Sequence, residues 1–205
     1  MNLDWKNLIE NLKKENVLKT PRIIKAFENV DRRDFVLDEY KDEAYVDTAF
    51  PILGGQTISQ PYTVTFILEL LQPRPGDKIL DIGAGSGWQT ALLAHIVGED
   101  GIIYAMEIMP AVCEFGRKNI AKYEFKNIEW FCQDAAVGLA EKALFNKIVA
   151  AAALDREVPQ AWLDQLKIGG RLVAPIENSI WLYIKENENN IKKQEYAGFS
   201  FVPFK

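Results

Sequence analysis

The spacing of apolar residues changes along the chain, and the change divides the sequence near residue 60. In the first fifty residues apolar side chains recur at helical intervals, which predicts one helix around residues 3–12 and a second from Pro21 onward. The chain then becomes irregular between Ala49 and Gly55, before a third predicted helix that begins near Pro61. The first part of the chain is therefore predicted to be helical.

Beyond residue 61, short apolar runs alternate with helical stretches. The predicted strands cover residues 78–82, 102–106, 128–132, 147–152, 170–176, 181–185 and 198–203. Strands that alternate with helices favour right-handed crossovers and a parallel sheet covered on both faces. The polar run 186–193 is predicted to be a loop that joins the last two strands as a terminal pair.

These elements predict an α/β fold. We expect a doubly wound, mostly parallel seven-stranded sheet of the Rossmann-like kind, preceded by an N-terminal helical cap. Residues 1–60 would form the extension and residues 61–205 the sheet domain, packed as one compact unit.

Composition and charge exclude several classes of protein. A net charge of −5 argues against a general nucleic-acid binder, because phosphate binding normally needs a basic face. We find no signal-peptide pattern and no apolar stretch near the roughly 18 residues of a membrane span, so we expect a cytoplasmic protein. Cys113 and Cys132 are predicted to be reduced and partly buried. We assign no metal site, and no heptad pattern indicates an oligomer, so we expect a monomer.

A glycine-rich turn follows the strand predicted at 78–82. Gly83, Gly85 and Gly87 stand at alternate positions between this strand and a helix, where the backbone can approach a ligand closely. A dinucleotide-binding loop more often has two residues before its third glycine, and Trp88 stands where its last small residue would be. Asp81, at the strand end, would suit the cationic part of a ligand.

Two further acids end the next two strands. Glu107 follows the strand at 102–106, where its carboxylate can accept both hydroxyls of an unphosphorylated ribose. Asp134 ends the third strand and would accept from the exocyclic amine of adenine. A glycine turn or a strand-end acid alone is often merely structural, so the inference rests on their conjunction. Together they indicate S-adenosylmethionine, a cationic and phosphate-free nucleoside cofactor.

The segment before the third predicted helix reads Gly54-Gly55-Gln56-Thr57-Ile58-Ser59-Gln60-Pro61. Two interpretations remain open from local chemistry. Ser59 or Gln60 would serve as an N-cap of the helix that begins near Pro61. Alternatively, the segment would carry part of an active site.

This segment, the loop at 79–89 and the run Gly169-Gly170-Arg171-Leu172-Val173 resemble protein-L-isoaspartate O-methyltransferases, which belong to the class I S-adenosylmethionine-dependent methyltransferases. The resemblance extends from about Leu8 to Phe204. It implies a methyltransferase fold and methyl transfer to the free α-carboxylate of isoaspartyl residues in damaged proteins or peptides, which initiates repair. Residues 1–60 would then lie on the substrate side.

The resemblance also implies residue roles. Ser59 matches the serine that the family uses in its active site, and Thr57, Ile58 and Gln60 would contact the substrate. The residues predicted to contact the cofactor, from the loop and from the resemblance, are Asp81, Gly83, Ala84, Gly85, Ser86, Gly87, Glu107 and Asp134. An α-carboxylate is ionised at neutral pH, so no strong general base is required, and His95 is assigned a structural role.

The chain also differs from the family pattern. Ala135 stands where the family usually has glycine, Asn146 replaces an aspartate, and the region after Pro175 is shorter. The alternatives are another methyltransferase of this class, acting on a small molecule or RNA, and a non-catalytic relative that binds the cofactor. The Asn/Asp-Pro-Pro-aromatic pattern of base-modifying enzymes is absent from the sequence.

Overall fold

A computed structural model describes residues 2–204 and contains a seven-stranded sheet in the order β5-β4-β3-β6-β7-β8-β9. The pairs among β5, β4, β3, β6 and β7 are parallel, and β8 and β9 are added antiparallel. The strands are β3 (Lys78–Ile82), β4 (Ile102–Met106), β5 (Ile128–Phe131), β6 (Phe145–Ala150), β7 (Leu166–Ile176), β8 (Ser179–Asn187) and β9 (Asn190–Ala197). The predicted fold class is confirmed.

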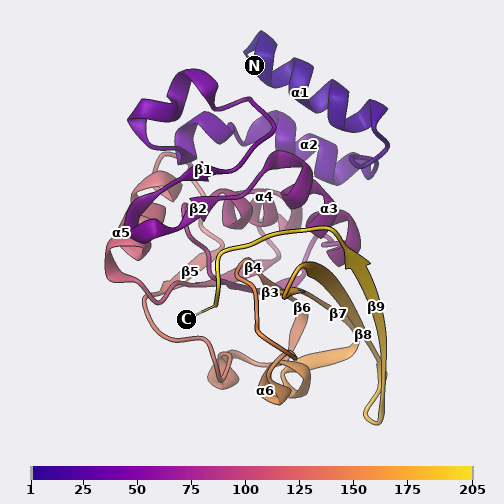
Figure 1. Cartoon of the computed structure of the whole chain (residues 1–205). Helices are drawn as coiled ribbons and strands as arrows, with labels where there is room; N and C mark the ends of the chain where they lie inside the picture. Colours follow the sequence, from indigo (N-terminus) through magenta and orange to yellow (C-terminus); the bar gives the residue numbers. More distant parts are fainter. Residues whose placement is uncertain (1, 205) are drawn as a thin grey trace.

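Helices cover the two faces of the sheet unequally. The helices are α1 (Leu3–Lys14), α2 (Pro21–Asn29), α3 (Pro61–Leu71), α4 (Trp88–Val97), α5 (Pro110–Ile120) and α6 (Gln160–Asp164). Figure 1 shows α1 and α2 beyond α3 and α4 on one side, and the short α6 on the other. None of the helices in residues 2–204 is long and apolar enough to cross a membrane.

Side chains of each strand alternate between the two apolar layers. In β3, Ile79 packs with α3 and α4, whereas Leu80 and Ile82 pack on the opposite face with Trp162 of α6. This alternation decides where polar residues of the strand point. Asp81 lies on the same side as Ile79, toward α4.

The N-terminal extension shares the core of the sheet domain. Trp5 of α1 is almost fully buried, donates from Nε1 to the Phe27 carbonyl at 2.9 Å and lies 6.3 Å from the Trp88 ring of α4. Apolar residues on both sides of residue 60 form one buried cluster. The extension is therefore attached by core packing and not by a flexible linker.

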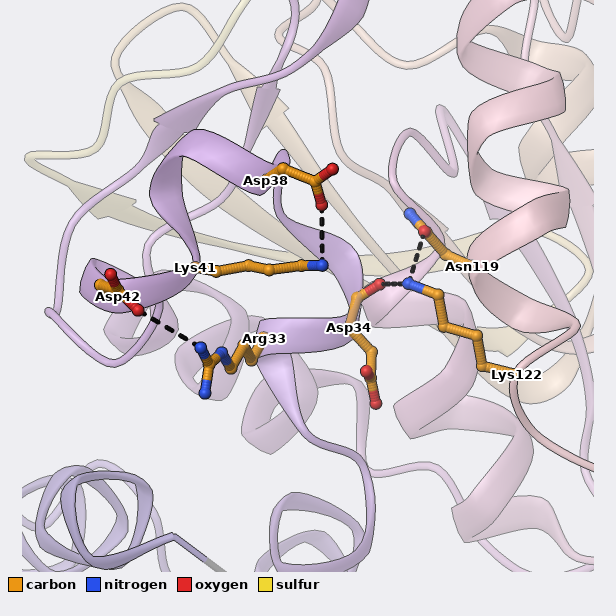
Figure 2. A network of polar contacts seen from close by, with 7 residues as sticks. All are labelled: Arg33, Asp34, Asp38, Lys41, Asp42, Asn119 and Lys122. Carbon is orange, nitrogen blue, oxygen red and sulfur yellow. Dashed lines mark hydrogen bonds and ion pairs between the residues drawn. The ribbon is translucent and has the colours of Figure 1, made fainter.

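A network of polar contacts ties the extension to α5. Figure 2 shows the Lys122 ammonium directed at the Asp34 carbonyl and at Asn119 Oδ1, which it reaches at 3.0 Å. Nearby, Lys41 pairs with Asp38 at 2.7 Å across the surface. Exposed ion pairs of this kind contribute about 0–1 kcal/mol each. The pair joins two residues of the extension, so in Figure 2 the contacts of Lys122 provide the link to α5.

The C-terminal strands differ from the prediction. β8 and β9 form a hairpin that turns at residues 188–189, so the predicted loop 186–193 is largely strand. Residues 198–203 form no strand, and Pro203 makes only an isolated bridge with Ala153. Most side chains of β9 are exposed, and backbone pairing with β8 holds the strand in place. No apolar alternation therefore marks it in the sequence.

Two other expectations also need correction. The helical stretch expected between β5 and β6 is a single short turn, Ala140–Lys142. Cys113 and Cys132, expected to be reduced, form a disulfide with Cα atoms 5.8 Å apart. The first turns of α5 and the end of β5 meet at this point, a contact that the sequence separation of 19 residues does not reveal.

Candidate active site

A cleft of about 850 Å³, open mouth included, lies at the carboxyl ends of β3 and β4. This is the position where ligands bind in open α/β sheets. Its walls combine the glycine loop, the end of β4, the Ser59 segment and the chain near the C-terminus. The lining residues that matter for the chemistry are Thr57, Ile58, Ser59, Gly83, Ala84, Gly85, Ser86, Gln89, Glu107, Gln133 and Ala135.

The glycine loop forms one wall of this cleft. Gly83 and Gly85 have φ of +74° and +56°, and Gly83 and Ala84 both donate from their backbone N–H groups to the Met106 carbonyl. Glycine adopts a positive φ more readily than other residues, which explains why glycines stand at positions 83 and 85. Gly87 does not line the cleft. A Cβ atom at Gly87 would lie 3.1 Å from Ile120 of α5, so this glycine permits helix packing.

Glu107 projects from the end of β4 into the cleft. One carboxylate oxygen accepts from the Gly85 N–H at 3.1 Å and the other from the Met109 N–H at 3.0 Å. The residue is 6% exposed. Each oxygen retains lone pairs toward the cleft, so a ribose diol placed there would find both acceptors already oriented.

Asp81 is buried and does not line the cleft. Its oxygens accept from Gln89 Nε2 at 2.9 Å and from Thr90 Oγ1 at 2.6 Å, both from the first turn of α4. Burial raises the pKa of Asp81 to about 6, and the nearby charge of Glu107 adds to the rise, while the two hydrogen bonds oppose it. Gln89, which the sequence did not single out, lies between Asp81 and the cleft.

The pKa of Asp81 predicts a pH-dependent stability. Because this pKa is higher than the value of about 3.9 in an unfolded chain, the carboxyl favours the native state below about pH 4. That contribution, at most about 3 kcal/mol, is lost as the pH rises through about 6. Asp81→Asn cannot titrate, so its Tm relative to the native protein is expected to increase from about pH 4 to about pH 8. A Tm difference that is the same at both pH values would contradict the shift, with the exposed Asp134→Asn as control.

Asp134 does not line the cleft either. Its side chain is exposed, and Oδ1 accepts from the Ala136 N–H at 2.8 Å, which closes a tight turn. The neighbours Gln133 and Ala135 line the cleft in its place. Ala135 is buried, and its carbonyl accepts from Trp162 Nε1 at 2.8 Å. Asp134 follows the end of β5 at Phe131 by three residues, and its contact with adenine stays a prediction.

Ser59 lies where the cofactor cleft meets a second cavity. The second cavity shares Thr57, Ser59, Ala151 and Val202 with the first, and Gln60, Tyr62 and residues 198–201 are among its other walls. Gln60 contacts only this second cavity. Within the described residues no hydrogen bond restrains the Ser59 hydroxyl, so it is free to bind a ligand from either side.

The N-terminus of α3 is capped by a different residue from the two considered. Asp47 accepts from the Tyr62 N–H at 2.8 Å and from Gln60 Nε2 at 3.1 Å, and Gln60, in the N-cap position, makes no side-chain cap bond. The helix-cap interpretation of Ser59 is therefore wrong. No local pattern reveals this cap, because Asp47 is 15 residues from Tyr62.

The fold, the glycine loop and the carboxylate at the end of β4 define the Rossmann-like class of S-adenosylmethionine-dependent methyltransferases. A family model described as "Protein-L-isoaspartate(D-aspartate) O-methyltransferase (PCMT)" matches residues 3–205. The chain belongs to this family.

Individual proteins agree with the family match. The chain is 36% identical to the protein-L-isoaspartate O-methyltransferase of Methanopyrus kandleri, with 96% of this chain and 88% of the relative covered. A solved structure named protein-L-isoaspartate O-methyltransferase has a TM-score of 0.87 at 26% identity, with 97% and 65% covered. A Plasmodium falciparum protein, provisionally given the same name and solved with S-adenosyl-L-homocysteine, has a TM-score of 0.86 at 25% identity, with 98% and 97% covered.

Proposed function

We propose that the protein transfers a methyl group from S-adenosylmethionine to the free α-carboxylate of L-isoaspartyl residues in damaged proteins or peptides, which initiates their repair. One observation carries this proposal: Ser59 lies at the junction of the cleft beside the glycine loop and a second open cavity. A methyl donor in the first and a peptide in the second would meet beside its hydroxyl. The family supplies the reaction type, and its members are named for this activity.

The residues of the cleft fit S-adenosylmethionine. Glu107 offers two oriented acceptors for the ribose hydroxyls, and Gly83, Ala84, Gly85 and Ser86 allow close approach of the amino-acid part. We assign Asp81 an indirect role, in which it orients Gln89, and Asp134 a role in shaping the turn beside the adenine. The cofactor, when bound, supplies an electrophilic methyl group on a cationic sulfur.

The protein's own contribution is to position the acceptor and exclude water. The acceptor carboxylate has a pKa of about 3.5 and is ionised at neutral pH, so no residue has to remove a proton. The Ser59 hydroxyl would donate a hydrogen bond to that carboxylate and align it with the methyl group. Thr57 and Gln60, which line the second cavity, would contact the peptide around it, whereas Ile58 lines only the cofactor cleft. His95 lines neither cavity, which agrees with a structural role.

The proposed activity predicts a sharp difference between two peptides. An isoaspartyl peptide is expected to form a methyl ester, whereas its normal aspartyl twin is not, because only the isoaspartyl form presents an α-carboxylate beside the backbone.

Ser59→Ala is expected to lower kcat/KM about tenfold or more, since a hydrogen bond to a charged group contributes about 1.5–3 kcal/mol. Radioactive methyl transfer measures both, and cofactor affinity by calorimetry should stay unchanged.

Ser179→Ala provides a matched control for Ser59→Ala, since it removes a serine hydroxyl that donates to Glu195 at 2.7 Å and lines neither cavity, and it should retain native turnover. No ester on either peptide, from protein that binds the cofactor, would reject the proposed acceptor. A loss of cofactor affinity equal to the loss of turnover in Ser59→Ala would reject the proposed role of Ser59. We also propose that the protein acts without nucleic acid, which the net charge of −5 supports. We propose further that it is a cytoplasmic monomer, and light scattering tests its oligomeric state.

A further inference from the structure

Arg32 is a fully buried cation that the proposed reaction does not use directly. It belongs to the short helical turn Arg32–Phe35 of the N-terminal extension and is 0% exposed. Its guanidinium lies 5.2 Å from the centre of the Phe50 ring and 5.4 Å from that of Trp88. Trp88 lines the cofactor cleft, so Arg32 is packed directly behind the site.

The guanidinium donates to four backbone carbonyls. Nη1 donates to Ala44 at 2.8 Å and Val46 at 3.1 Å, and Nη2 donates to Thr48 at 2.7 Å and to Ser59 at 3.1 Å. The last acceptor is the carbonyl of the residue that we place beside the reacting carboxylate. A single side chain therefore connects the segment 44–48 to the Ser59 backbone.

Asp47 also restrains the segment around Ser59, through the residues that follow Ser59 in the sequence. It lies within the segment that Arg32 binds, and its carboxylate holds the Gln60 side chain and the Tyr62 N–H. Ser59 is thus fastened at its own carbonyl by Arg32 and just beyond it by Asp47. Burial lowers the pKa of Arg32 to about 9 and Asp47 opposes the shift, so the guanidinium is charged at neutral pH.

A purely structural role explains this arrangement less well. No carboxylate of the described chain lies within ion-pair distance of Arg32, and its Nε is buried without a hydrogen-bond partner. Such a cation is costly to bury, and apolar residues of similar volume often stabilise a core as well or better. What an apolar residue cannot do is to hold four carbonyls at fixed positions.

We propose that Arg32 is a positioning residue for methyl transfer, which holds the Ser59 backbone so that the hydroxyl faces the junction of the two cavities. This inference rests on the proposed role of Ser59. The planar guanidinium fork is essential to it, because the ammonium of lysine has three donors around one nitrogen and cannot reach four separate acceptors.

Arg32→Lys tests the proposal because it keeps the charge and removes the fork. It is expected to lower kcat with an isoaspartyl peptide about tenfold, while the Kd for S-adenosylhomocysteine changes less than about twofold. Arg33→Lys, a substitution of the same type at the exposed neighbouring position, is the matched control and should retain native kcat.

A double-mutant cycle separates positioning from general destabilisation. If Arg32 acts through Ser59, then Arg32→Lys should cause less than about a twofold further loss in a Ser59→Ala background. Losses that multiply fully, or an equal loss of cofactor affinity, would overturn the proposal for Arg32. Should Ser59→Ala retain native activity, the role of Ser59 itself fails, and this outcome is distinct because it appears without any change at Arg32.

Hydrogen exchange covers the case in which Arg32→Lys is only partly folded. In the folded population, amides of residues 57–60 are expected to exchange faster than in the native protein, while those of the loop 83–87 keep their native rate. Equal acceleration in both segments would show a global effect and would overturn the proposal. Native exchange rates in residues 57–60 would do so as well.

Discussion

Glu107→Ala is expected to weaken S-adenosylmethionine binding by at least about 100-fold. The ribose hydroxyls would lose two hydrogen bonds to a carboxylate, each of which contributes about 1.5–3 kcal/mol. The substitution also releases the Gly85 and Met109 N–H groups that this carboxylate holds at 3.1 and 3.0 Å. Isothermal calorimetry with the cofactor and with S-adenosylhomocysteine measures the effect.

Asp134→Ala is the control for this change. Both residues are acids at the ends of neighbouring strands, but the Asp134 carboxylate is exposed and turned toward the Ala136 N–H. Its removal is expected to change cofactor affinity less than about threefold, since the bond that it loses closes a surface turn. Equal losses of cofactor affinity in the two variants would contradict the different roles that we assign to the two acids. Native affinity in Glu107→Ala would refute the role of Glu107 in binding ribose.

Gly116→Ala is expected to give the second large effect, a loss of both stability and cofactor affinity. Gly116 lies in α5, where a Cβ atom would be 2.5 Å from the Gly85 carbonyl oxygen and 2.6 Å from the Trp130 ring. Alanine favours a helix over glycine by about 1 kcal/mol, but overpacking costs about 1–3 kcal/mol and displaces the cofactor loop. We expect Tm to fall by several degrees and Kd to rise at least about tenfold.

Gly76→Ala separates the two effects. A Cβ atom at Gly76 meets no atom within 4 Å, yet its φ of +79° makes alanine unfavourable. This variant should lose stability without losing cofactor affinity. If Gly116→Ala is destabilised by a similar amount and still binds the cofactor normally, the close contact of α5 with the loop is not what shapes the site.

Much of the site was predictable because its parts are local in sequence. The glycine loop is a consequence of a strand, a tight turn and a helix in succession, and Glu107 follows directly from the end of β4. Both lie in the cleft as expected. The segment at Ser59 was recognised by family resemblance, whereas local chemistry allowed a helix cap that the structure assigns to Asp47.

Side-chain direction at strand ends was less predictable. Asp81 and Glu107 both belong to the carboxyl ends of parallel strands, yet Asp81 faces α4 because it shares the side of Ile79. The strand pattern assigns a residue to an edge of the sheet. Which face it uses, and whether a helix side chain intercepts it, depends on the packing of α4.

The sequence by itself determined the class of fold, the cofactor loop and the acid that follows β4, because apolar period, turn chemistry and the succession of strands and helices depend on neighbouring residues. Only the tertiary structure decided the Cys113–Cys132 disulfide, the pairing of β9 and the four carbonyls around Arg32. The disulfide and the Arg32 contacts join residues 12 or more positions apart, and the mostly exposed β9 has no apolar alternation, so no local period encodes these pairings. Such contacts form where separate elements pack together, and the contact of Arg32 with the Ser59 carbonyl is one of them.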